Sequence, residues 1–441
     1  MPNIGRFLGG TRFIVNPAGG GGVQITGITP ASVVQTQTMG STTTGRALHG
    51  AMDNDGIDGV ASFTGTPQGY DGGTPYTSLP LAYAAGNNVD PGATGVPITI
   101  PAGEGRCIVK SVSTVWDSRD ALLKWRLPVF VVPSEPPANA LPPAINAPSY
   151  ISRFTLADID MDLHPSLSPG FATPNPAIVL NAWRWNWQDQ HPVRPQADRL
   201  TGSGFEPQFR RDAAKLAIEA LLCSCLTTDA DVKTMLRVWT VIHAENLVQS
   251  LERGMRFNHP QTDGGVQNGR KMIVVMGALL TGDSLMTSWA QRTDWASEDA
   301  YCQYVNAEML TRFGSGVAGV TSGFLPEDEG IPWWFAGPTS WGSAVVKDYP
   351  IRTFWRRAYQ EMFHVHMTGV HALAGIFPGF KAMWNNQVVF DYMDRMHYRT
   401  LYSDPGSEVG KGAKNGGTNN PSIFARNMFL TYGPGAVWDW P

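Results

Sequence analysis

The sequence predicts an α+β protein in which a β-rich N-terminal domain precedes a mainly α-helical domain. Residues 1–100 hold eight charged side chains and 20 of the 48 glycines, and residues 133–148 hold six prolines. Helix-forming patterns dominate only after about residue 205. We therefore expect a β-rich attachment or assembly domain at 1–132, a Pro-rich linker at 133–148 and a domain of helical hairpins at 149–441.

Composition excludes several classes of protein. Of 441 residues, 42% are hydrophobic and 16% are charged, and the net charge is −4. A chain of this kind buries a core rather than remaining disordered, and its slight negative charge argues against a nucleic-acid partner. No apolar stretch approaches the ~20 residues that span a membrane, so we expect no membrane insertion. The N-terminal segment lacks the apolar core of a signal peptide, which predicts folding in a cytoplasm.

Strands are expected where short β-branched runs alternate with Gly, Pro and Asn turns. In the N-terminal domain these runs are Arg12–Val15, Gly22–Thr26, Gly105–Val115 and Leu127–Val132. The six prolines that follow cannot continue a helix or a central strand. They favour extended, polyproline-like backbone, and hence a semi-rigid spacer.

Helices are expected in the C-terminal half. The clearest is Ala230–Arg253, which Thr228 or Asp229 can cap and which carries apolar residues every three to five positions. Lys271–Leu280 is too short and too apolar for its period to separate helix from strand. Further helical patterns cover Phe209–Cys223, Glu298–Phe313, Arg352–Leu373 and Gln387–Tyr398. In contrast, Trp183, Trp185 and Trp187 alternate at a spacing of two, as on one face of an extended segment.

The most informative segment begins on the predicted helix Ala230–Arg253. Trp239, His243 and Asn246 follow one another at spacings of four and three, so they share a helix face. The loop after this helix is locally basic, with Arg253, Arg256, His259, Arg270 and Lys271. Together they could hold an anionic sugar. The alternative is a core His243 beside a solvated loop.

A second candidate segment is 383–399. Trp384, Asn385, Tyr392 and Arg395 combine a stacking surface with directional hydrogen bonding, which suits the apolar ring faces and the hydroxyls of a sugar. A structural role fits this segment equally well, with Tyr392 packed and Arg395 paired with a neighbouring aspartate. The sequence offers no converging set of metal ligands, and we expect neither a metal nor another cofactor.

Two runs resemble segments of the α/α-toroid carbohydrate-active domains, a class that includes the alginate lyase and heparinase-type polysaccharide lyases. These runs are DGGVQNGRKMIVVMGALLTGD at 263–283 and WNNQVVFDYMDR at 384–395. The resemblance implies a toroid-like barrel of helical hairpins over roughly 205–400. It also implies β-elimination at a uronic acid, in which one side chain removes a proton and others neutralise the carboxylate.

By this resemblance His243 is the candidate base, Asn246 neutralises the substrate carboxylate and Tyr392 donates the proton. Arg256 and Arg270 would clamp the sugar acid. The other candidate substrate contacts are Trp239, His259, Trp384, Asn385 and Arg395.

Residues 1–150 resemble the charge-poor, Gly/Thr/Ser-rich β modules of bacteriophage virion proteins. This resemblance implies a tail or spike protein of the virion, which forms a homo-oligomer and contacts other virion proteins through its N-terminal region. The full hypothesis is a virion protein that recognises, and could depolymerise, an acidic polysaccharide of the host surface. One alternative is a free polysaccharide lyase that acts by β-elimination on uronic acids. The other is a purely structural virion or adaptor protein whose toroid is inactive.

Overall fold

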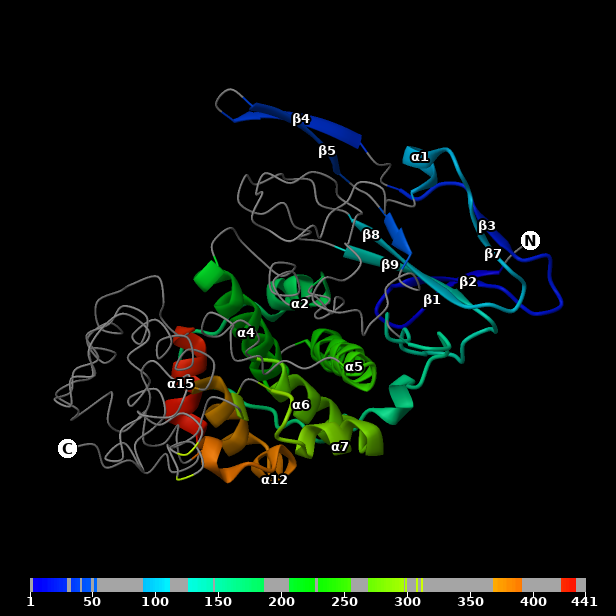
Figure 1. Ribbon diagram of the computed structural model, residues 1–441. Helices are drawn as coiled ribbons and strands as arrows, with labels where there is room; N and C mark the ends of the chain where they lie inside the picture. The colour runs from blue at the N-terminus through cyan, green and yellow to red at the C-terminus, as the bar shows by residue number, and fades with distance from the viewer. Residues whose placement is uncertain are drawn as a thin grey trace, which may run out of the picture.

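The structure is a computed structural model in which both helices and strands are well defined (Figure 1), so the protein is of the α+β class, as predicted. It describes residues 3–29, 33–39, 42–48, 51–53, 90–111, 126–145, 147–185, 206–226, 229–254, 269–296, 298–299, 307, 311, 368–390 and 422–433.

The largest sheet of the described residues has the strand order β1-β2-β9-β8-β6. Its central pair, β2 and β9, is parallel, with Phe13 opposite Phe130, and the other neighbours are antiparallel. A second, two-stranded sheet joins β3 and β7. The strands of these two sheets are β1 (Ile4–Arg6), β2 (Arg12–Val15), β3 (Val23–Ile25), β6 (Ala51–Asp53), β7 (Ile98–Ile100), β8 (Arg106–Ser111) and β9 (Arg126–Val132). The expected strands at 12–15, 22–26 and 127–132 are therefore confirmed, with shorter bounds at 22–26. The strand expected at 105–115 is confirmed as far as Ser111, and residues 112–115 lie outside the described residues.

Strands β4 (Val33–Met39) and β5 (Thr42–Leu48) form a separate antiparallel hairpin. All seven residues of each strand are paired, from Val33 with Leu48 to Met39 with Thr42. The hairpin extends to one side of the other strands (Figure 1). Only two residues separate β5 from β6, so the hairpin is joined closely to the edge of the large sheet.

The helices gather on the other side of the molecule (Figure 1). Lys271–Leu280, which the sequence left open between helix and strand, lies within a helix, and this helix ends at Gly282, whose φ of 63° is left-handed. The helical elements are α1 (Pro91–Thr94), the short 3-10 helix at Leu156–Asp158, α2 (Pro176–Trp185), α4 (Glu206–Cys223), α5 (Ala230–Glu252), α6 (Lys271–Thr281), α7 (Ser284–Gln291), α12 (Phe380–Trp384) and α15 (Ile423–Tyr432). Residues 368–376 are also helical.

The extended tryptophan segment is a wrong prediction for the part that the structure describes, because Trp183 and Trp185 lie in α2. Pro176 stands at the start of this helix, and the Asn175 side chain accepts a hydrogen bond from Ala177 N at 2.9 Å. Proline and an Asn cap both favour a helix start. Trp183 is then fully buried in the core, so packing decides the conformation. Trp187 lies outside the described residues.

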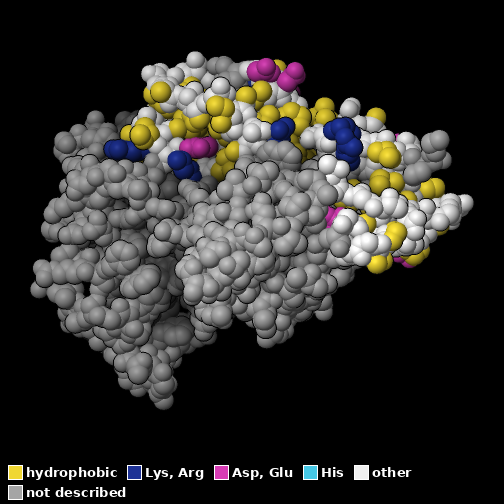
Figure 2. All heavy atoms as spheres, turned by 90° about the horizontal axis from the view of Figure 1, so that it is seen from above, with side chains coloured by type: hydrophobic (Ala, Val, Ile, Leu, Met, Phe, Trp, Pro, Cys, Tyr) yellow, Lys and Arg dark blue, Asp and Glu magenta, His cyan; other side chains and the backbone are white. Residues whose placement is uncertain are grey.

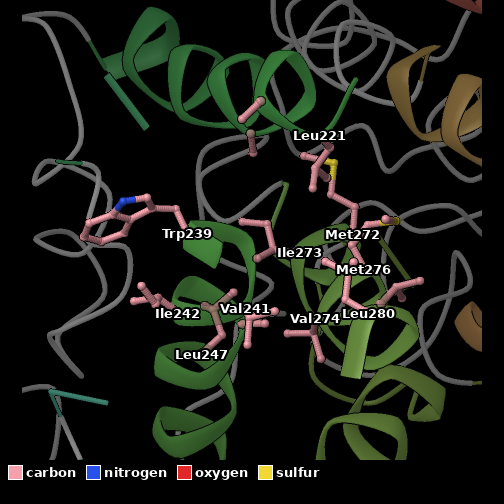
Figure 3. Close-up of a cluster of buried hydrophobic side chains, with 14 of the residues drawn as sticks. Leu221, Trp239, Val241, Ile242, Leu247, Met272, Ile273, Val274, Met276 and Leu280 are labelled. Atoms are coloured by element: carbon pink, nitrogen blue, oxygen red, sulfur yellow. The ribbon is translucent and has the colours of Figure 1, made fainter. Parts of the chain in front are cut away.

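Helix α5 is the centre of the core. Every residue from Leu236 to Leu251 is buried, which is typical of a helix surrounded on all sides. Figure 3 shows Val241 facing α6, where Ile273 and Val274 meet it, whereas Trp239 and Ile242 point away from α6. At the α5–α6 contact a Cβ added to Gly277 would lie 2.3 Å from the Cβ of Ala244. The two helices therefore approach each other more closely than any larger residue at Gly277 permits.

The Pro-rich segment 133–148, which the sequence predicts to be a semi-rigid linker, is exposed at 134, 135, 137–139 and 148, but most of its second half is buried. Ala140, Leu141, Ala144, Ile145 and Ala147 are buried in the same hydrophobic cluster as the large sheet and the helices. The backbone N–H groups of two of these residues are also satisfied, since Leu141 N donates to Phe154 O at 2.8 Å and Ala147 N donates to Ala144 O at 2.9 Å. Small and apolar residues between the prolines allow this burial, so the segment joins the sheet to the helices.

Charged side chains are sparse on the described surface in Figure 2, where apolar side chains are interspersed with uncharged ones. The large apolar side chains that remain exposed include Ile4, Val96, Ile151, Ile178 and Ile423. Within the described part of the chain, no helix combines the length and the apolar character needed to cross a membrane.

Candidate functional site

His243, the candidate base, lies on α5 between two indole rings. Its ring centroid is 4.3 Å from that of Trp183 and 5.7 Å from that of Trp239. The imidazole has no exposed surface, and its Nε2 lies 3.0 Å from the backbone oxygen of Trp183. A carbonyl oxygen only accepts, so Nε2 carries the proton. Burial lowers the pKa of His243 to about 4, and the ring is neutral at pH 7.

Asn246, the candidate carboxylate neutraliser, uses both ends of its amide inside the protein. Its Oδ1 accepts a hydrogen bond from Ile145 N at 2.8 Å, and its Nδ2 donates to Ile242 O at 2.8 Å. The side chain is 2% exposed. Asn246 therefore fastens the Pro-rich segment to α5, which is the role of a structural asparagine.

Trp239 lies on the face of α5 that meets the N-terminal β-rich part. A Cβ added to Gly9 would lie 3.4 Å from Cζ2 of Trp239, and Gly9 has a φ of 97°, which only glycine adopts readily. The indole is 3% exposed. Its ring surface is thus used in packing against the chain turn at Gly9.

The second candidate segment is described only as far as residue 390. Trp384 ends α12 with no exposed surface, and Asn385 follows it in a left-handed conformation with a φ of 57°. Asn385 Nδ2 donates to Gln291 O at 3.0 Å, which ties α12 to the end of α7. Arg270, at the start of α6, is 5% exposed.

Five of the six described candidates are buried, namely Trp239, His243, Asn246, Arg270 and Trp384, whereas Asn385 is exposed. His243, Asn246 and Trp239 lie together on α5, whereas Trp384 and Asn385 lie at the end of α12 and Arg270 at the start of α6. The candidate proton donor and three candidate substrate contacts lie outside the described residues, and these are Tyr392, Arg256, His259 and Arg395.

Sequence reasoning missed a buried ionic cluster at the start of α6. Lys271 Nζ lies 2.5 Å from Asp299 Oδ2, and neither side chain is exposed. Asp299 Oδ1 accepts from Trp384 Nε1 and from Asn386 Nδ2, each at 3.0 Å. Beside it, buried Glu298 accepts from Gly269 N at 2.7 Å. Lys271 stands before an apolar run, which is a weak sign of burial, but no spacing links it to Asp299 or Trp384.

A second charged group joins the segment after the Pro-rich region to the helices. Arg153 contacts Glu245 Oε2 at 2.5 Å and Asp283 Oδ2 at 2.8 Å. Glu245 is 3% exposed, and burial raises its pKa although Arg153 opposes this shift. Its other oxygen accepts from Gln249 Nε2 at 2.9 Å. A carboxylate held in this way is satisfied within the protein and is not presented to a substrate.

A third buried pair lies in the β-rich part. Lys110 Nζ on β8 lies 2.5 Å from Asp90 Oδ2, and both side chains are fully buried. Asp90 also caps α1, because its Oδ1 accepts from Gly92 N at 3.0 Å. The pair therefore fixes this short helix against the sheet.

The charged groups described above are held by contacts within the protein. In the described ranges, no three His, Cys, Asp or Glu side chains gather in a way that could hold a metal ion. Cys107, Cys223 and Cys225 are buried free thiols. No family model, curated protein or solved structure matches this chain.

Proposed function

We propose that this chain is an architectural protein of a larger assembly, a bacteriophage virion, and that its N-terminal β-rich region binds neighbouring subunits. The observation that carries the proposal is the β4–β5 hairpin, which extends beside the other strands (Figure 1). Among the described residues, its strands pair only with each other. A two-stranded hairpin is marginally stable by itself in water. Its outer edges are templates to which a strand of a partner can be added.

The partner that best fits the hairpin is a second copy of this chain. Strands β4 and β5 read VVQTQTM and TTTGRAL, and Arg46 is the one charged residue in these two strands. Edge strands usually prevent pairing with copies of themselves through charges or prolines. These strands carry a single charge and no proline, so nothing in their sequence opposes homotypic pairing.

The buried positions of the candidate catalytic side chains support an architectural role over a glycan-cleaving one. His243 and Asn246 each bond to backbone groups of other segments, at Trp183 and Ile145. A general base must reach the proton that it removes, and both side chains are enclosed by packing. The toroid-like arrangement of the helical part remains a component of this proposal, in the inactive form.

Sedimentation velocity of the full chain over a range of concentrations tests the proposal. Successive N–H groups of a strand point to opposite edges, so Gln37→Pro and Thr38→Pro remove donors from different edges of β4. We expect wild-type chains to associate, and the variant that loses the outer donor to remain monomeric with unchanged circular dichroism. A wild-type chain that stays monomeric at every concentration would refute homotypic assembly.

A parallel assay separates the lyase alternative. The full chain is incubated with uronate polysaccharides, and the absorbance of unsaturated uronate is followed. Under the architectural proposal we expect no product. Product formation that His243→Phe abolishes, without loss of the fold, would favour the lyase.

A further inference from the structure

The buried Lys271–Asp299 pair has the arrangement of two groups that can become covalently joined. Lys271 is the first residue of α6, and Asp299 lies 28 residues later in the chain. Their side chains meet at 2.5 Å between Nζ and Oδ2 and have no exposed surface. Two groups held in contact at a fixed position react with a very high effective concentration.

Burial shifts both groups toward their uncharged forms. Burial lowers the pKa of the Lys271 amine and raises that of the Asp299 carboxyl. In each case the charge of the partner opposes burial, which remains the larger effect. An uncharged amine has the lone pair that a nucleophile needs, and an uncharged acid carries a hydroxyl that can leave as water.

The second oxygen of Asp299 is held by two donors. Trp384 Nε1 and Asn386 Nδ2 both donate to Oδ1 at 3.0 Å. When a nucleophile adds to a carboxyl carbon, negative charge develops on the oxygen that stays. Two fixed N–H donors on that oxygen stabilise the charge, as in an oxyanion hole.

We propose that Lys271 and Asp299 form an intramolecular isopeptide bond. The lone pair of Nζ attacks Cγ of Asp299, and a C–N bond forms while the bond from Cγ to Oδ2 breaks. Oδ2 leaves as water with its own proton and one proton from the amine. No oxidant, reductant or other reactant is consumed.

The amide product would keep the hydrogen bonds that Lys271 and Asp299 make with Arg292, Trp384 and Asn386. The remaining amide N–H keeps an acceptor, because Lys271 Nζ lies 2.9 Å from Arg292 O. The amide oxygen, which is the former Oδ1, keeps Trp384 and Asn386 as donors. The reaction also replaces two buried ionisable groups, whose charged forms are costly to desolvate, by a neutral and hydrogen-bonded amide. This inference is independent of the assembly proposal.

Intact mass spectrometry of the denatured full chain tests the bond. We expect a mass lower than that of the sequence by one water, and a tryptic species in which Lys271–Arg292 is joined to Thr293–Arg312. Trypsin would not cleave after a modified Lys271. A wild-type chain with the full sequence mass would overturn the proposal. Loss of water that maps to the Lys110–Asp90 pair would also overturn it.

Two variants locate the reaction. Lys271→Arg keeps the positive charge but removes the amine, so we expect the full sequence mass. A mass loss that persists in this variant would refute the assignment. Asp299→Asn should link with loss of ammonia instead of water, which gives the same final mass as the linked wild-type chain. It tests the bond even if Lys271→Arg does not fold.

Discussion

Replacement of Asn246 by leucine tests whether this residue has a structural or a catalytic role. The substitution keeps the side-chain size but removes the acceptor of Ile145 N, which lies 2.8 Å from Oδ1 in the core. A buried N–H left without its partner costs about 1–3 kcal/mol. A residue retained for catalysis alone would change activity and leave the free energy of unfolding almost unchanged.

The assay is hydrogen exchange of the Ile145 amide, combined with thermal unfolding. A local cost of about 1–3 kcal/mol corresponds to roughly 5- to 150-fold faster exchange at this amide, since each 1.4 kcal/mol is a factor of ten. Ser250→Ala is the matched control on the same helix. Ser250 is buried and its Oγ donates to Asn246 O at 2.8 Å, whereas Ile145 N donates to the side chain of Asn246. Unchanged protection of Ile145 in Asn246→Leu would refute the structural role.

Substitutions at three other places have defined outcomes. The pKa of His243 falls from 6.5 in the unfolded chain to about 4 in the folded one, so the unfolded state binds a proton first and stability declines as the pH drops from 6.5 to 4. His243→Phe should flatten this slope by an amount that approaches about 3 kcal/mol, measured by urea unfolding across that range; an unchanged slope would contradict the pKa. Gly277→Ala should lower stability by about 1–3 kcal/mol because its Cβ would meet Ala244 at 2.3 Å, and a neutral effect in urea unfolding would disprove the close helix contact. Arg153→Met leaves Glu245 buried without its cation and should cost roughly 3 kcal/mol. Addition of Glu245→Gln should restore part of that loss, and strictly additive effects would argue against the pair.

Local signals predicted much of the secondary structure. The helix expected at Ala230–Arg253 is observed as Ala230–Glu252, because Asp229 caps it: its side chain accepts from Asp231 N and Val232 N. Strand Leu127–Val132 is observed as Arg126–Val132. Both elements are determined by residues close together in the sequence, and such local patterns can be recognised in a single sequence.

The candidate site depended on contacts that no local pattern contains. His243 and Asn246 do share a face of α5, as their spacing predicts, but that face meets Trp183 and Ile145 rather than solvent. Periodicity shows which residues share a face, and it does not show what covers that face. The pairing of Lys271 with Asp299 depends in the same way on where α6 packs, so the sequence alone could not show it.

The enclosure of α5 has a consequence for biosynthesis. Its neighbours come from both sides of it in the sequence, from the turn at Gly9 and the segment at Ile145 to Ile273 and Val274 on α6. Until α6 has been synthesised, the apolar side of α5 that packs against Ile273 and Val274 (Figure 3) has no partner in the nascent chain. The segments up to and including α5 therefore cannot complete their core as a separate domain before α6 has been synthesised. The core around α5 can close only after the residues of α6 have been synthesised.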